Sequence, residues 1–107
     1  MLLTHQAEVN VTDNNGLTPL HGAVCNGHQD VAALLVASHA LVNATDQSGW
    51  TPLHYTSLGY RNVAELLLAH GAEVNARNRF GATPLHLAQE NRRQDVAELL
   101  REHGGHE

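Results

Sequence analysis

Cysteine and long apolar runs are scarce in this 107-residue chain, and their scarcity excludes several classes of protein. The single cysteine, Cys25, rules out an internal disulfide and a zinc site built from several cysteines. No apolar run approaches the ~20 residues that cross a bilayer, and the N-terminus lacks the basic region and long apolar stretch of a signal peptide. We therefore expect an intracellular protein, cytoplasmic or nuclear, that does not bind membranes.

Lysine is absent, and the remaining charge is unevenly distributed. The formal net charge is −5, which argues against nucleic acid as a partner because phosphate binding needs a basic face. Residues 1–60 contain four acids and no strong cation, whereas all six arginines lie in residues 61–107. Arginine suits bidentate pairing with carboxylates, so the C-terminal half can attract an acidic partner; the alternative is an ordinary solvated surface.

Sequence motifs of catalysis are missing as well. The chain has no glycine-rich phosphate loop, no nucleophile elbow and no His-Glu-x-x-His pattern, and nothing in the sequence marks Cys25 as activated. We expect no enzyme, no catalytic residue and no cofactor. Aromatic residues make up 4% of the chain and charged residues 16%, so a single domain over residues 1–107 must build its core from leucine, valine and alanine.

An internal repeat dominates what the sequence does contain. The tetrapeptide Thr-Pro-Leu-His starts at Thr18, Thr51 and Thr83, at spacings of 33 and 32 residues. Each threonine can cap a helix and each following proline suits a first helical turn, so a helix is expected to begin at every copy. Apolar residues at i, i+3 and i+4 predict two short antiparallel helices per unit, and Asp-x-x-Gly segments between units predict projecting turns.

These motifs, together with the Gly-His reversal at 27–28 and the Gly-Ala-Glu-Val-Asn segment at 71–75, resemble the ankyrin repeat across essentially the whole chain. The resemblance implies an all-α solenoid of stacked antiparallel helix pairs with projecting hairpin loops. It also implies a non-enzymatic protein-protein interaction module that binds a protein or peptide through its loop tips and first-helix surface. The imidazoles of His21, His54 and His86 are then expected to hydrogen-bond the adjacent turn, and no metal site is expected.

The repeats divide the single domain into units of unequal length. We expect the C-terminal half of a repeat at 1–12, a repeat at 13–45, a repeat one residue short at 46–77 and a C-terminal capping repeat at 78–107. The last unit is expected to cap the stack because Arg101 replaces an outer apolar position. The first unit has no polar cap, so Leu2 and Leu3 are expected to contribute to an apolar patch that mediates self-association.

The shortened repeat departs most from the pattern. Because it has one residue fewer, the reversal between its helices must be remodelled, and Thr56 and Ser57 place hydroxyls on a packing face. We expect cooperativity to be weakest at residues 52–62; hydrogen exchange that finds them best protected would contradict this. His39 and Gln6 stand where other units have glycine, which predicts strain at those helix ends.

Three asparagines share one position in the repeat: Asn10, Asn43 and Asn75. The resemblance makes this position a target of asparaginyl hydroxylation in some ankyrin proteins. The alternative is that each asparagine caps its turn through side-chain hydrogen bonds.

Positions that vary between the repeats carry apolar, aromatic and arginine side chains. Tryptophan and tyrosine are over-represented among interface hot spots, so Trp50, placed at a loop tip, is expected to contact a partner. The alternative is that Trp50 folds back on its own loop. If Trp50 binds, its truncation to alanine is expected to weaken partner capture and leave the melting temperature nearly unchanged. The expected contact residues are Leu17, Gln47, Ser48, Trp50, Tyr55, Arg77, Arg79, Phe80, Leu87 and Arg92.

The third repeat contains several arginines, from which we expect a preference for an acidic partner. Arg77, Arg79, Arg92 and Arg93 are expected to flank one edge of this repeat, where they would steer an acidic partner. The runner-up function is a structural spacer of a larger ankyrin scaffold, or an engineered or excised segment of repeats, with no partner of its own.

Overall fold

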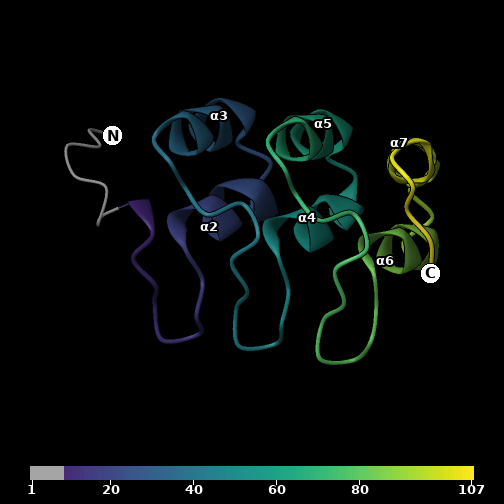
Figure 1. Cartoon of the computed structure of the whole chain (residues 1–107), viewed down its shortest axis with the longest axis horizontal. Coiled ribbons are helices and arrows are strands. Elements are labelled where there is room, and N and C mark those ends of the chain that lie inside the picture. Colours follow the sequence, from purple (N-terminus) through teal and green to yellow (C-terminus); the bar gives the residue numbers. More distant parts are fainter. Residues whose placement is uncertain (1–8) are drawn as a thin grey trace.

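The computed structural model describes residues 9–107, which form a row of helix pairs with long loops between them (Figure 1). The elements are α2 (Pro19–Cys25), α3 (Gln29–Ala37), α4 (Pro52–Tyr55), the 3₁₀-helix η1 (Thr56–Leu58), α5 (Arg61–Ala69), α6 (Pro84–Glu90) and α7 (Gln94–Glu102). No β-strand occurs within residues 9–107, in agreement with the all-α class expected from the sequence. The predictions made for Leu2, Leu3 and Gln6 lie outside the described residues.

The helix pairs stack side by side along the long axis of the molecule (Figure 1). Helices α2, α4 and α6 form one layer and α3, α5 and α7 form a second, while three hairpin loops project beyond the first layer. The buried apolar residues are all leucine, valine or alanine, as the composition predicted. Fully buried leucines join the layers and the repeats, namely Leu20, Leu35, Leu53, Leu67 and Leu100. Burying such a side chain contributes about 1.5–3 kcal/mol.

Each first helix begins at a Thr-Pro pair, as the tetrapeptide predicts. Thr18, Thr51 and Thr83 have extended backbone, and each side-chain oxygen accepts a hydrogen bond from the backbone N–H three residues later. Proline occupies the first helical turn in all three, where its missing N–H would have no partner in the helix. These contacts span only three residues, which explains why the sequence alone locates the helix starts.

Two of the three tetrapeptide histidines also tie one repeat to the next. Nδ1 of His54 accepts a hydrogen bond from the backbone N–H of Thr51 (2.9 Å), so Nε2 carries the proton and donates to the carbonyl oxygen of Ala82 (2.9 Å). His21 bonds Thr18 and the carbonyl oxygen of Trp50 in the same way. The expected contact with the adjacent turn is therefore confirmed for these two histidines.

The prediction for His86 is wrong. Its ring is half-buried, and its nitrogens lie 3.4 Å from carboxylate oxygens of Glu90 and Glu107. His21 and His54 each donate to a carbonyl oxygen in the hairpin loop of the following repeat, that of Trp50 for His21 and that of Ala82 for His54. His86 lies against the carboxylates of Glu90 and Glu107 instead of a loop carbonyl.

The shortened second repeat has the remodelled reversal that its length requires. Helix α4 ends after four residues, and η1 continues the turn to Gly59, which adopts a left-handed conformation with φ 115°. Thr56 and Ser57 are both fully buried. The hydroxyl of Thr56 donates to the carbonyl oxygen of Leu53 (2.7 Å), whereas that of Ser57 has no partner. An unsatisfied buried hydroxyl destabilises a fold, which supports the prediction of a weak joint at residues 52–62.

The three shared asparagines bridge repeats instead of capping their own turns. Asn43 accepts from the N–H of Glu73 (2.8 Å) and donates to the carbonyl oxygen of Gly71 (3.1 Å), both at the end of the following helix pair. Asn75 bonds His106 and Gly104 in the same way. The prediction of side-chain hydrogen bonds to a turn is correct in kind, but the turn belongs to the next repeat.

His39 adopts the left-handed conformation that its position requires, with φ 73°, where Gly71 has φ 93°. Left-handed backbone destabilises a residue that has a side chain by roughly 1–2 kcal/mol. Glycine avoids this cost, but its greater conformational freedom in the unfolded chain offsets part of the gain. His39→Gly is therefore expected to raise the free energy of unfolding by about 0.5–1 kcal/mol in urea denaturation. The matched control is Gly71→Ala, whose new methyl group would touch nothing within 4 Å and which should lower stability by a similar amount. Equal stability of wild type and His39→Gly would contradict the expected strain.

Candidate functional site

The three hairpin loops have the same hydrogen-bonded turn at their tips. Oδ1 of Asp46 accepts from the backbone N–H groups of Ser48 (2.9 Å) and Trp50 (3.0 Å). Asp13 and Asn78 make the equivalent pairs of bonds in the first and third loops. Such Asx turns fix the backbone, so the residues between the Asx and the glycine point outward from a rigid support.

Hydrogen bonds also connect neighbouring loop tips. The N–H of Gln47 donates to the carbonyl oxygen of Asn15 (2.9 Å), and its side chain donates to that of Asn14 (2.8 Å). The N–H of Arg79 donates to the carbonyl oxygen of Ser48 (3.0 Å). Gln47 and Ser48 are both exposed, which a contact with a partner requires. Their hydrogen bonds also hold the three loops in register.

Trp50 and Tyr55 form an aromatic cluster where the second loop meets α4. Trp50 follows the turn instead of forming its tip, is half-buried, and its ring centroid lies 4.8 Å from that of Tyr55 and 5.8 Å from that of His54. The hydroxyl of Tyr55 donates to the carboxylate of Asp46. Burial first, and then this hydrogen bond and charge, raise the pKa of Tyr55 above its ordinary value, so the phenol stays protonated. Because Trp50 packs on its own repeat, Trp50→Ala is expected to lower stability as well as any affinity.

The third loop carries the most exposed aromatic side chain. Phe80 is 83% exposed at its tip, beside the exposed Arg79. Arg77 is exposed on the same loop, and its Nη1 lies 3.5 Å from the carbonyl oxygen of Gly81. An apolar ring and two guanidinium groups thus stand together on one rigid turn.

The remaining predicted contact residues, Leu17, Leu87 and Arg92, lie on three different parts of the molecule. Leu17 and Leu87 are half-buried, at the start of the first repeat and on α6. Arg92 lies at the reversal between α6 and α7, with φ 57°, and lines a hollow with Arg93 and Arg101. The prediction that Arg77, Arg79, Arg92 and Arg93 flank one edge stays a prediction, although Arg92 and Arg93 line a hollow that contains no residue of the third loop.

Within residues 9–107, Arg61 is the one arginine that forms an ion pair, with Glu65 on the same helix (2.6 Å). The same part of the chain contains no group of three His, Cys, Asp or Glu side chains able to hold a metal ion. None of the described helices is both long enough and apolar enough to span a membrane. The remaining arginines are therefore available to carboxylates outside residues 9–107 or on a partner.

Comparison with known families agrees with this architecture. A family model described as ankyrin repeats (3 copies) matches residues 1–78, and one described as ankyrin repeats (many copies) matches residues 57–101. The chain belongs to the ankyrin-repeat family. A search of curated proteins found no match at the threshold applied. Ankyrin repeats are in general non-enzymatic protein-protein interaction modules, so this ankyrin-repeat protein has the scaffold of a binding protein.

Some features of this ankyrin-repeat protein escaped the sequence interpretation. The asparagine bridges and the bonds between loop tips join residues about 30 positions apart, and their only sequence signal is recurrence in register. The hollow beside Arg92 and Arg101 gave no local signal, because its residues come from α6, the reversal and α7.

Proposed function

We propose that this ankyrin-repeat protein binds a partner protein or peptide along the loop tips and the first-helix layer. The observation that carries this proposal is Phe80, an almost fully exposed aromatic side chain on a turn fixed by Asn78. Aromatic side chains on rigid supports lose little conformational freedom on binding and are enriched at interface hot spots. Arg77 and Arg79 favour a partner with acidic residues near its apolar anchor.

The proposed surface extends from the third loop to the second repeat. Trp50 and Tyr55 offer partly exposed rings. Gly22 stands in the first repeat at the position equivalent to Tyr55, and a Cβ added there would meet nothing within 4 Å. Leu17 and Leu87 add apolar area at either end. The low cysteine content supports an intracellular location for such an interaction.

A peptide-display selection on the intact chain tests this proposal. We expect selected peptides to share a bulky apolar residue with acidic neighbours, and Phe80→Ala to weaken them about tenfold or more while leaving the melting temperature unchanged. Leu34→Ala is the control, because Leu34 is an exposed apolar residue on α3, in the other layer. The proposed surface would be contradicted if Phe80→Ala and Leu34→Ala weakened peptide binding equally, or if Phe80→Ala did not weaken it at all. A selection that yields no ligand would favour the spacer function.

A further inference from the structure

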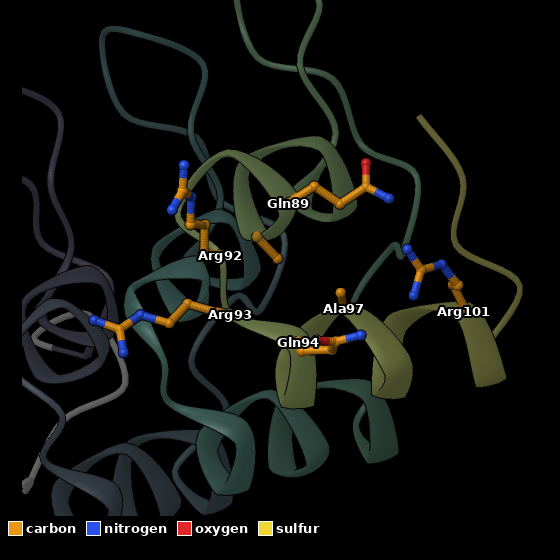
Figure 2. A pocket seen from close by; sticks show the side chains of 7 residues that line it. Gln89, Arg92, Arg93, Gln94, Ala97 and Arg101 are labelled. Carbon is orange, nitrogen blue, oxygen red and sulfur yellow. The ribbon is translucent and has the colours of Figure 1, made fainter.

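The end of the stack formed by α6 and α7 contains an open hollow of about 340 Å³ (Figure 2). Its lining residues are Ala88, Gln89, Arg92, Arg93, Gln94, Ala97 and Arg101. Ala88 and Ala97 are its two buried lining residues, and we call them its floor. The longer side chains of Gln89, Arg92 and Arg101 stand around Ala97 (Figure 2). This face is distinct from the loops that carry Phe80 and Arg79.

The same face of the first repeat shows how this hollow differs from a stacking surface. Val24 and Val36 are buried there, and the corresponding residues of the third repeat are Gln89 and Arg101. The small floor is retained, since alanine occupies both corresponding positions in the first repeat. The third repeat thus replaces apolar walls with hydrogen-bond donors.

The hollow concentrates positive charge in a protein whose formal net charge is −5. Three arginines line it and no acidic residue does. Arg93 turns away from Arg101 and lies against Gly59 of the second repeat, whereas Arg92 and Arg101 stand on opposite sides of the floor (Figure 2). Neither Arg92 nor Arg101 forms an ion pair with another residue of the described segment, 9–107.

The carboxylate of Glu107 already accepts a hydrogen bond from a side chain that lines the hollow. With its amide nitrogen turned toward Glu107, Gln89 donates to Oε1 of that residue (2.9 Å), and its own oxygen accepts from Nη2 of Arg101 (2.7 Å). His86 lies 3.4 Å from the same carboxylate oxygen. Gln89 and Arg101 are therefore oriented by a hydrogen-bond chain that ends on an anion.

We propose that this hollow docks an acidic segment of a partner protein, in addition to the loop-tip surface. Carboxylates of the segment pair with Arg92 and Arg101 while its backbone crosses the alanine floor. Arg92 lies two residues before α7 and Arg101 lies in its last turn, so the nine residues of α7, roughly 13 Å at the helical rise, separate the two backbone positions. An extended acidic segment spans that distance with four or five residues.

The test uses a ten-residue glutamate peptide and the intact chain labelled with ¹⁵N, titrated at low salt. We expect amide shifts centred on Ala88, Ala97 and Arg101, and affinity that falls severalfold between 50 and 200 mM salt. Arg101→Gln and Arg92→Gln should each weaken binding about fivefold or more. Arg61→Gln removes the same charge on α5 and should change affinity less than about twofold. Circular dichroism checks that each variant is folded.

Other outcomes overturn the proposal and leave the loop-tip surface to be judged separately. Shifts centred on residues 77–81, with Arg79→Gln as the most damaging variant, would move the acidic partner to the third loop. Inorganic phosphate that reproduces the shifts at Arg101 at equal concentration would reduce the hollow to a simple anion site. Self-association abolished by Arg101→Gln would assign the hollow to a second copy of the chain.

Discussion

His54→Ala is expected to lower the free energy of unfolding by about 3 kcal/mol, whereas His86→Ala should lower it by less than about 0.5 kcal/mol. Both residues end the same Thr-Pro-Leu-His tetrapeptide. His54 is fully buried, and its loss leaves a cavity and two groups without partners, the N–H of Thr51 and the carbonyl oxygen of Ala82. His86 is half-buried at the end of the stack and bonds only side chains.

Urea denaturation of the two variants measures this difference directly. Equal losses of stability would show that the histidine acts only within its own tetrapeptide, contrary to the bonds between repeats. Because the two local sequences match, helix propensity contributes nearly equally to both variants, whereas the His54 side chain also completes a capping box with Thr51 that His86 lacks.

The pH dependence of stability gives a second measurement on the same residue. Burial, the largest effect, lowers the pKa of His54 below its ordinary value of 6.5, although backbone hydrogen bonds and the charge of Asp46 act in the opposite direction. The unfolded chain therefore binds the proton more readily than the folded protein does. Stability is expected to fall as the pH drops below 6.5, and this fall should be smaller in His54→Ala.

Gly49→Ala is expected to lower the free energy of unfolding by about 3 kcal/mol, whereas Gly81→Ala should lower it by about 1 kcal/mol. The two glycines occupy the same turn position with φ 77° and 78°, so the cost of left-handed backbone is the same in both. A methyl group at Gly49 would lie 2.9 Å from the backbone nitrogen of Arg79 in the next loop, whereas one at Gly81 would meet nothing within 4 Å.

The difference between the two variants therefore isolates the contact between neighbouring loops. The clash at Gly49 would also disturb the hydrogen bond from the N–H of Arg79 to the carbonyl oxygen of Ser48. If chemical denaturation finds the same loss of stability in both variants, the second and third loops can move apart without lowering the free energy of unfolding. The loop tips would then not be held in register.

Local interactions explain why much of the fold was predictable from the sequence. The cap at Thr18 reaches three residues along the chain, and the apolar spacing of each helix repeats within two turns. Recurrence at 33 and 32 residues then identified the helix pairs and the short second repeat. Even the strain at His39 followed from its alignment with Gly71.

The candidate site was less predictable because its geometry depends on contacts between repeats. The sequence identified Trp50 as a variable aromatic residue, but its packing against Tyr55 and His54 depends on the path of the chain between the turn and α4. It likewise grouped Arg79 with Arg92, although Arg92 follows α6 and lines a hollow that contains no residue of the third loop.

The sequence by itself therefore determined the ankyrin family, the order of the helices and the residues of the turns, since these depend on motifs a few residues long and on their recurrence at 33 and 32 residues. Only the tertiary structure decided that His21 and His54 bond the next repeat whereas His86 does not, and that Arg92 and Arg101 face one hollow. The physical reason is that hydrogen bonds and charges act over a few ångströms, and stacking brings residues about 30 positions apart within that range.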